Sequence, residues 1–437
     1  MSECNVHGEG SGSTGSGRYS HGAHLLGALA AKRGAPLGMH LQIADRCNHA
    51  CAHCYQVQGL KGELSLDEVK AVLDDMAAAG VLTLNVSGGE ATLRPDLVDI
   101  LRHARSRGFA VRLYTNAFLV DDALADTLAG VGLHEVHVSL YSTLPEEHDA
   151  VTRVPGSWAR TMRGVKALRA RGVRVILKCP MVALCPEGAA GVKALALSLG
   201  CGYAGGTDLT AMEDGNLKPL GLAADAAQLQ KAGLLKGWLP AEDEAARQLT
   251  RLGHAACGVG ATGLVVLPNG DVLPCTDTPV VMGNLATQRL GALLASAPEV
   301  PLFRGLTLGD VHGCRDCALL TACKRCHATA LHEGGDYLGP YPSACARARA
   351  RYAAGLEVEA VEVLAPAPGC APDRAPTVGP YAIEAPGRLR PVPDVITAAD
   401  EALAAQFPWI RPGRLIMVAE GHEALVPLRL GRTMAAR

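Results

Sequence analysis

Segments that predict strands and helices alternate along the first half of the chain, and this alternation constrains the fold more than any other feature. Six β/α units in series favour a parallel sheet wrapped by helices, and six units instead of eight predict an open, partial barrel of the (β/α)6 type. A Ser65–Glu68 capping box predicts the start of the first helix, and Pro95 predicts the start of the second. Functional side chains are expected on the loops after the carboxyl ends of the strands. The apolar runs expected to form the strands are residues 39–43, 82–86, 110–114, 135–139, 173–178 and 203–209.

Composition divides the 437 residues into four regions. Residues 1–36 are rich in glycine and serine and predict a disordered tail. Residues 37–235 carry the alternating pattern of the barrel. Residues 251–350 carry seven cysteines but few long periodic segments, which favours a small domain held by metal. Residues 351–437 begin helically, continue through a Pro-rich linker and end in strand-like runs, so they predict a small C-terminal extension.

The composition excludes several classes of function. Lysine and arginine total 41 and aspartate and glutamate total 43, so the net charge of −2 offers no basic field for nucleic acid or an anionic membrane. Aromatic residues make up 4% of the chain, which is too few for a broad base-stacking surface. No apolar run reaches the roughly 18 residues that a membrane span needs. The N-terminus is a poor signal peptide and most of the 15 cysteines stand in tight groups, so we expect a cytoplasmic, reducing location.

Three cysteines stand together in the loop after the first predicted strand. Cys47, Cys51 and Cys54 have the spacing C-x3-C-x2-C. Three thiolates this close can hold three corners of a four-iron cluster and leave one iron open to a further ligand. The same spacing also suits a zinc knuckle with a distant fourth ligand. One β/α unit later the second predicted strand ends in Ser87-Gly88-Gly89-Glu90, where the glycines let the backbone approach a ligand closely.

The stretch from Cys47 to Tyr55, followed by Ser87-Gly88-Gly89-Glu90, closely resembles radical S-adenosylmethionine (SAM) enzymes. The resemblance implies a [4Fe–4S] cluster on the three cysteines, with SAM chelating its open iron through the methionyl amine and carboxylate. The bound cofactors would supply a 5′-deoxyadenosyl radical that abstracts hydrogen from an unactivated C–H bond. The residues that match the family's SAM contacts are Gly88, Gly89 and Glu90 for the amino group, His53 for adenine, Asn116 and Ser139 for the methionyl and ribose groups, and Arg153 for the carboxylate. For Asn116 and Arg153 an ordinary turn or surface role stays open, and for Ser139 a strand-capping role.

Seven more cysteines lie within about ninety residues in the second half of the chain. Two C-x2-C pairs among them suit a structural zinc ribbon. The pattern also resembles the SPASM extension of radical SAM enzymes, which carries two auxiliary [4Fe–4S] clusters. By that resemblance the first auxiliary cluster would use Cys257, Cys275 and Cys326, and the second would use Cys314, Cys317, Cys323 and Cys345.

Two features of this chain depart from the SPASM pattern. The last spacing, Cys323-x2-Cys326, is one residue shorter than usual, and no fourth cysteine is evident for the first auxiliary cluster. Either one iron is open to a substrate amide or thiolate, or a side chain other than cysteine completes the site. Asp277 and His254 are the nearby candidates in the sequence.

Most enzymes with this extension act on peptides or proteins, so the resemblance implies a maturase that forms, for example, a thioether or carbon–carbon crosslink. A haem-precursor oxidase stays open as an alternative. A sulfatase-maturing, formylglycine-forming enzyme would place its aspartate base directly after the second SPASM cysteine, but Thr276 stands there and Asp277, the candidate catalytic residue, follows it. Because 36 residues precede the barrel, we expect a separate leader-binding protein or direct docking on the barrel. A separate flavodoxin or ferredoxin is expected to donate electrons.

Overall fold

The computed structural model describes three parts of the chain. The first is residues 36–235 without 60 and 187, and the third is the backbone of three short strands between 377 and 391. Between them it describes residue 247 and residues 251–355, apart from 256, 261, 262, 279, 312, 315 and 316. The predicted N-terminal tail up to residue 35 and the strand-like runs near the C-terminus lie outside the described residues.

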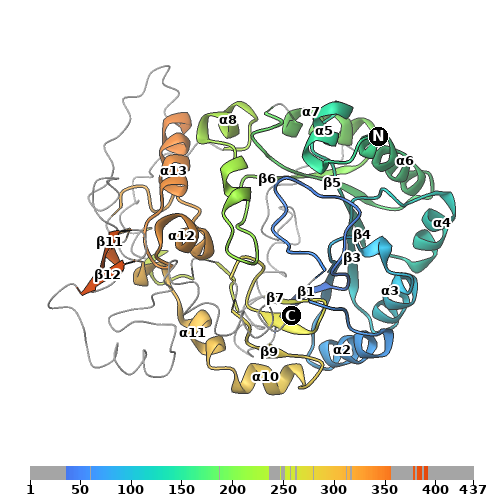
Figure 1. Cartoon of the computed structure of the whole chain (residues 1–437), viewed down its shortest axis with the longest axis horizontal. Coiled ribbons are helices and arrows are strands. Elements are labelled where there is room, and N and C mark those ends of the chain that lie inside the picture. The colour runs from blue at the N-terminus through green and yellow to red at the C-terminus, as the bar shows by residue number, and fades with distance from the viewer. Residues whose placement is uncertain are drawn as a thin grey trace.

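The six predicted strands are all present and lie side by side in chain order as a parallel sheet, which confirms the predicted fold class. Helices cover the outer face of this curved sheet, as Figure 1 shows for α2, α3, α4 and α6. The strands are β1 (Gly38–Gln42), β2 (Thr83–Ser87), β3 (Ala110–Thr115), β4 (Glu135–Ser139), β5 (Val175–Pro180) and β6 (Gly202–Gly206). The helices between them are α2 (Leu66–Ala78), α3 (Leu97–Ser106), α4 (Asp122–Val131), α5 (Pro145–Thr152), α6 (Ser157–Ala170) and α7 (Gly188–Ser198).

Two helix starts can be compared with those predicted from Ser65 and Pro95. Ser65 caps α2 as predicted, with its side chain and that of Glu68 completing the reciprocal capping box. Pro95 does not begin the next helix: α3 starts at Leu97 behind Asp96. The reason is local, because Asp96 is held by an ion pair from Arg94 at 2.7 Å, so it flanks the helix without entering it. The short helix α5 was not predicted, since its sequence has only a weak apolar stripe.

Alternation along the strands gives the barrel an apolar outside and a polar inside. The helix-facing side chains form one large core, which includes Leu41, Leu84, Leu113, Val138 and Leu177. The residues that alternate with them point to the inside of the barrel, because successive side chains of a strand lie on opposite faces. Those inner positions are mostly polar; they include His40, Asn85, Tyr114, His137 and Lys178.

The sheet continues beyond the barrel into the cysteine-rich region. Strand β7 (Gly263–Val266) pairs in parallel with β1, and β8 (Asp271–Leu273) and β9 (Gly283–Asn284) follow it in antiparallel order. The result is a nine-stranded sheet in the order β6-β5-β4-β3-β2-β1-β7-β8-β9. Val266, Val272 and Leu290 belong to the same core as the barrel. The first part of the cysteine-rich region is therefore built onto the barrel sheet.

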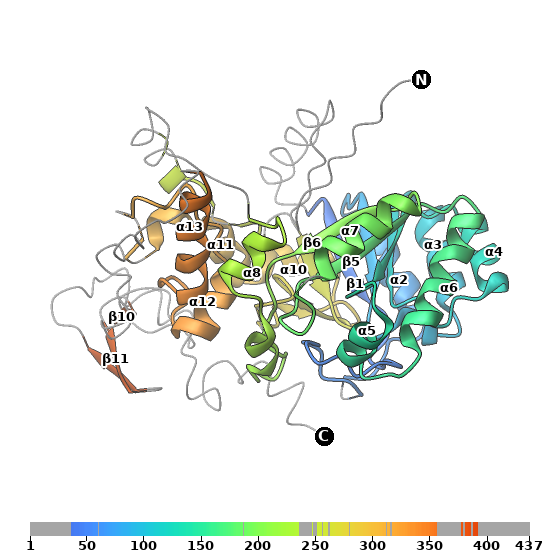
Figure 2. The same ribbon diagram turned by 90° about the horizontal axis from the view of Figure 1, so that it is seen from above.

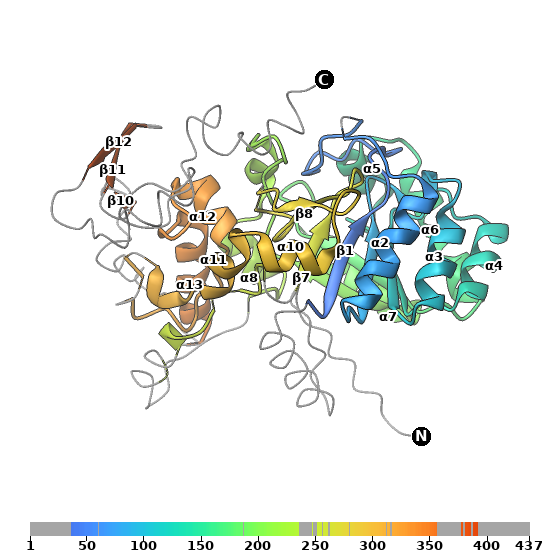
Figure 3. The ribbon, with the colours of Figure 1, turned by 90° about the horizontal axis from the view of Figure 1, so that it is seen from below.

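The rest of the cysteine-rich region is a group of short helices beside the barrel (Figures 2 and 3). It has its own small core, in which Phe303, Leu331 and Tyr337 are buried. The short helix α8 (Ala226–Lys231) lies between this region and the barrel and packs against α13 (Figure 2). The other helices are α10 (Leu290–Ser296), α11 (Glu299–Gly305), α12 (His327–Gly334) and α13 (Pro342–Gly355). Short 3-10 turns occupy η1 (Ala91–Leu93), η2 (Lys218–Leu222) and η3 (Leu308–Asp310).

A second, three-stranded antiparallel sheet follows α13 in the chain. Its strands are β10 (Thr377–Val378), β11 (Tyr381–Ala385) and β12 (Arg388–Pro391). In the part of the chain that the structure describes, every helix is too short or too polar to cross a bilayer.

Candidate functional site

The cysteine loop, residues 46–55, follows β1 and is held by the end of α5. The backbone amides of Ala50 and Ala52 donate to the carbonyls of Thr152 and Val151, at 3.1 and 2.8 Å. These bonds fix the loop at the carboxyl edge of the sheet, where functional loops of such folds gather.

Cys47, Cys51 and Cys54 are free, half-buried thiols whose charges affect one another. Burial raises the pKa of Cys47 to about 11 and that of Cys51 to about 12, and the neighbouring thiols add to the shift at Cys51. Three thiolates in this setting need a cation to stabilise them, and a metal centre supplies one. The donor set therefore fits a thiolate-bound iron–sulfur cluster, with Cys47, Cys51 and Cys54 as the residues that would hold it.

The glycine pair at the end of β2 packs against the cysteine loop. A Cβ atom at Gly88 would lie 2.5 Å from the carbonyl oxygen of Ala44, and one at Gly89 would meet the carbonyl of Arg46. The amides of Gly89 and Glu90 donate to these same carbonyls, at 2.8 and 2.9 Å. The sequence led us to expect that the glycines make room for a ligand. In the structure they first make room for the backbone that precedes Cys47.

Glu90 ties three loops together at the carboxyl edge. Its side chain is buried and accepts hydrogen bonds from the hydroxyl of Thr115 at 2.5 Å and the amide of Asn116 at 2.7 Å. Asn116 in turn donates from Nδ2 to Oδ1 of Asn48 at 2.8 Å, next to Cys47. The structure thus brings the predicted residues Glu90 and Asn116 to the cysteine loop. Each carboxylate oxygen can accept more than one bond, so Glu90 can also accept from a bound amine.

His53 and Ser139 meet at a residue that sequence reasoning missed. The ring of His53 lies edge-on to Tyr141, with centroids 4.8 Å apart. The Tyr141 hydroxyl is hydrogen-bonded to the side chains of Ser139 and Cys51. Burial lowers the pKa of His53 to about 4, so the ring is neutral, and its buried Nδ1 has no hydrogen-bond partner in the described chain. The only signal for Tyr141 in the sequence is its place two residues after a strand end.

Arg153 lies just after α5 and borders a cavity of about 600 Å³ beside the cysteine loop. Its backbone is left-handed, with φ at 59°. Cys51, Cys54 and Lys218 also line this cavity. The exposed Arg153 therefore shares this cavity with two of the three thiols, and its guanidinium is free to meet a carboxylate bound there.

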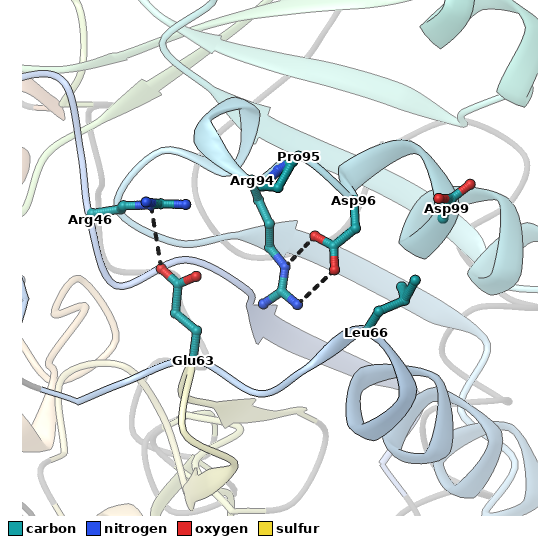
Figure 4. Close-up of a pocket in the computed structure, with 7 residues that line it drawn as sticks. All are labelled: Arg46, Glu63, Leu66, Arg94, Pro95, Asp96 and Asp99. Atoms are coloured by element: carbon teal, nitrogen blue, oxygen red, sulfur yellow. Dashed lines mark hydrogen bonds and ion pairs between the residues drawn. The ribbon is translucent and has the colours of Figure 1, made fainter.

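A second cleft, of about 450 Å³, lies on the outer side of the same loop (Figure 4). Arg94 is 6% exposed there and donates to the carbonyls of Ile43 and Leu64, both at 2.7 Å. It also forms the ion pair with Asp96, while Arg46 pairs with Glu63 at 3.8 Å (Figure 4). These charges satisfy one another, and they brace the end of β1 against the segment that leads into α2.

The seven cysteines of the second group fall into two sets in space. Cys326 interacts electrostatically with Cys275 and Cys257. Cys323 interacts instead with Cys314, Cys317 and Cys345. These are the sets expected for the first and second auxiliary clusters. Six of the seven thiols are half-buried and Cys257 is exposed. Burial is the main cause of the raised pKa values of Cys275, Cys323 and Cys326, so the donors again fit thiolate-bound clusters.

Asp277 interacts electrostatically with both the first auxiliary set and the cysteine loop. Its carboxyl group is hydrogen-bonded to the side chain of Thr210, which follows β6, and its charge acts on both Cys275 and Tyr55. Burial raises the pKa of Asp277, and Asp208 adds to the shift. His254, the other candidate, is exposed, and its backbone bonds to Arg251 and Leu308. The geometry favours Asp277 over His254 as a residue of the site.

Two further side chains beside Cys275 were missed by sequence reasoning. Thr278 Oγ1 lies 3.2 Å from Cys275 Sγ and 3.3 Å from the hydroxyl of Tyr337. Tyr337 is fully buried and stacks on His327, with ring centroids 4.9 Å apart. Such residues look like ordinary core positions in a sequence, because their role depends on a contact between residues about sixty positions apart in the chain.

Comparisons with known proteins agree with this arrangement. The family model described as "Radical SAM superfamily" matches residues 41–195, and "SPASM: Iron-sulfur cluster-binding domain" matches residues 257–327. A PqqA peptide cyclase from Rhodopseudomonas palustris is 30% identical over 73% of this chain and 89% of that protein. Another, from Ruegeria pomeroyi, is 35% identical, but the alignment covers only 34% of this chain and 40% of that protein. An AdoMet-dependent heme synthase from Methanosarcina barkeri is 26% identical over 72% of this chain and 97% of that protein.

Solved structures agree on the fold. Streptococcus suis SuiB bound to the precursor peptide SuiA superposes with a TM-score of 0.58 and 16% identity, over 79% of this chain and 84% of that one. The partial barrel and the cysteine triad beside a Gly-Gly-Glu turn define a radical SAM enzyme. The chain belongs to the radical SAM superfamily, in its branch with a C-terminal SPASM domain. Its cofactors are SAM and a [4Fe–4S] cluster, with auxiliary iron–sulfur clusters in the SPASM domain.

Proposed function

We propose that this enzyme modifies a peptide or protein by removing hydrogen from one of its residues, as in forming a thioether or carbon–carbon crosslink. The observation that carries the proposal is that the charge of Asp277 acts both on Tyr55 of the cysteine loop and on Cys275 of the first auxiliary set. Oxidative crosslinking needs a radical centre, a proton acceptor and an electron acceptor close together. A cyclase of peptides among the relatives, and a neighbour bound to a precursor peptide, support the same substrate class.

The residues around the cysteine loop would bind and orient SAM. When bound, SAM and the cluster supply a radical that abstracts hydrogen. Glu90 accepts from the methionyl amine, and Asn116 is held in place by its bonds to Glu90 and Asn48. The neutral His53 ring offers a flat, partly apolar contact for adenine, fixed by Tyr141. Arg153 pairs with the carboxylate, because guanidinium binds carboxylate through two parallel hydrogen bonds.

Asp277 would accept the proton that the substrate loses during oxidation. Removing two hydrogens from a substrate means removing one hydrogen atom, one proton and one electron. The bound cofactors would supply the radical that takes the hydrogen atom and the oxidant that takes the electron, and the Asp277 carboxylate would accept the proton. Thr210 orients the carboxyl group, and its burial keeps bulk water from competing for the proton.

The partners of this reaction follow from its electron balance. A separate reductant of the flavodoxin or ferredoxin type is proposed to deliver the first electron. The separate leader-binding protein and the cytoplasmic location also stay proposals. None of the cysteines in the described ranges is joined by a disulfide, which suits a reducing compartment.

The test is to supply the anaerobically reconstituted enzyme with a short peptide encoded beside it, together with SAM and a reductant. We expect a mass loss of about 2 Da, the mass of two hydrogens. A haem precursor is the parallel arm, because the heme synthase relative keeps that alternative open. An unchanged peptide, with productive SAM cleavage only on the haem precursor, would contradict the proposal. Metal content is measured first: about twelve irons and no zinc correspond to three four-iron clusters, whereas about four irons plus zinc would indicate a structural ribbon in the second domain.

A further inference from the structure

Lys178 places a positive charge on the inside of the barrel, where the proposed mechanism gives it no part. It lies on β5 in register with Ser139 of β4, so both side chains face the same way near the carboxyl ends of their strands. Its neighbours along the strand, Leu177 and Cys179, are buried in the core. Alternation therefore directs Lys178 into the barrel, at the level of a predicted SAM contact.

The Lys178 ammonium lies over one aromatic ring, and two imidazoles stack against that ring. Its Nζ lies 5.3 Å from the centre of the Tyr114 ring. That ring stacks on His137 at 4.6 Å and on His40 at 5.9 Å. Burial and the Lys178 charge lower the pKa of His40 to about 4, and burial lowers that of His137. Both imidazoles are therefore neutral near pH 7.

The carboxylate of Glu135 on the inner face is already engaged. It accepts from His137 Nε2 at 2.8 Å and pairs with Arg112 and Arg174, both at 3.2 Å. Within the ranges that the structure describes, Lys178 Nζ has neither an ion pair nor a hydrogen bond; it lies over the Tyr114 ring, and its charge acts on His40 and His137. Lys178 is half-buried, and a cation that faces the barrel interior without a counter-ion is a candidate for binding a ligand of opposite charge.

The same inner face carries unused hydrogen-bonding atoms. Gln42 is 1% exposed, and its Oε1 has no partner within the described residues. Oδ1 of Asn85 and Nδ1 of His137 are likewise buried and unpartnered there. Buried polar atoms are nearly always satisfied in native proteins. Their presence on one face with an unpaired cation indicates that a polar, anionic group binds inside the barrel.

We propose that Lys178 binds a carboxylate of the substrate inside the barrel, with Gln42, Asn85 and His137 contacting the polar atoms around it. This inference rests on the proposed peptide substrate and narrows it: the residue to be modified carries, or lies beside, an acidic side chain or a C-terminal carboxylate. Arg153, on the loop after α5, remains the separate cation for the carboxylate of SAM.

The test measures the reactivity of Lys178 in the full, reconstituted chain, and it needs no turnover. The chain is labelled with trace acetic anhydride, digested and analysed by mass spectrometry, with the probe N-acetylglutamate N-methylamide present or absent. At a probe concentration that fills about 90% of the sites, we expect labelling of Lys178 to fall about tenfold. The exposed lysines Lys166 and Lys193 in the same digests are the internal controls and should not change.

Three results would overturn the proposal. The first is equal protection by the neutral analogue N-acetylglutamine N-methylamide, because the site would then not recognise charge. The second is protection by SAM but not by decarboxylated SAM, which would assign the bound carboxylate to the cofactor. The third is the absence of protection by the glutamate probe. Failure of crosslinking on a test peptide would not affect any of these results, so the two proposals fail separately.

Two variants distinguish a loss of the Lys178 charge from a failure of the protein to fold. Lys178→Met removes the charge at similar length, and Lys178→Arg keeps it. By calorimetry we expect the glutamate probe to bind the Arg variant and the parent chain but not the Met variant. Iron content and SAM affinity should be the same in all three. Loss of probe binding in both variants, with iron content unchanged, would contradict a charge-based role.

Discussion

Gly89 lies directly against Cys47: a Cβ atom added to Gly89 would lie 3.1 Å from the Cβ of Cys47. The turn after β2 and the loop after β1 are therefore packed as one unit, with backbone bonds from Gly89 and Glu90 to the residues just before the first cysteine. This contact explains why the two motifs belong together. The second motif shapes the first before any ligand is bound.

We therefore expect Gly89→Ala to impair cluster assembly. The added methyl group meets backbone, which cannot move aside cheaply, so the cysteine loop must shift. After reconstitution the variant should lose about four irons per chain and keep those of the SPASM domain. Gly130→Ala is the matched control, because a Cβ there has nothing within 4 Å. A full iron content in Gly89→Ala would show that the contact is not needed for assembly.

Glu90→Gln should weaken SAM binding while the cluster still assembles. The variant keeps the size of the side chain but replaces the ionised acceptor that holds Thr115 and Asn116. We expect an increase of about tenfold in the dissociation constant for SAM, which corresponds to about 1.4 kcal/mol. Equilibrium dialysis with the reconstituted protein measures it. Glu68→Gln, in the exposed capping box of α2, is the control, and equal affinity in both variants would contradict a role for Glu90.

Tyr141→Phe should change the midpoint potential of the cluster and leave the contact with adenine in place. The ring that His53 touches is retained, whereas the hydroxyl bonded to Cys51 is removed. Hydrogen bonds to cluster sulfurs favour the reduced state, so the midpoint potential should become more negative. Spectroscopic redox titration measures the shift, and SAM affinity serves as the check on binding. An unchanged potential at full iron content would rule out this contribution.

Asp277→Asn should separate SAM cleavage from product formation. If the carboxylate accepts the substrate proton, its loss lowers product formation by about 10²–10⁴-fold, while cleavage of SAM continues. Because burial raises the pKa of Asp277 and a base acts when deprotonated, product formation in the parent enzyme should rise with pH through that pKa. The variant should lack this rise. A loss of iron from the first auxiliary set in Asp277→Asn would instead identify the residue as a cluster ligand.

The sequence alone was sufficient to predict the features that depend on residues close together in the chain. The six barrel strands follow from alternation of short apolar runs with helices, and the spacing of Cys47, Cys51 and Cys54 needs only eight residues. Ser65 caps its helix through a neighbour three positions away. In each case the interacting groups are close in the chain, so the local sequence pattern is enough to predict the interaction.

The rest depends on contacts between distant segments. The pairing of β7 with β1 joins residues about 225 positions apart and has no local signal. Tyr141 and Lys178 read as ordinary strand-end residues until the sheet register shows which way they face. Pro95 fits a helix start, but the Arg94–Asp96 ion pair moves that start by two residues. These positions were beyond reach because their partners come from other elements.

The continuous sheet limits how modular this enzyme can be. Strand β7 belongs to the cysteine-rich half of the chain, yet it covers the edge of β1, the strand that leads into the cysteine loop. A truncation that ends before β7 would expose that edge and invite pairing between molecules. A chimaera that exchanges SPASM regions would have to carry β7 with it. The distance between the cysteine loop, which follows β1, and Cys275, which follows β8, is thus set by main-chain pairing, and a substrate that reaches both must fit that fixed distance.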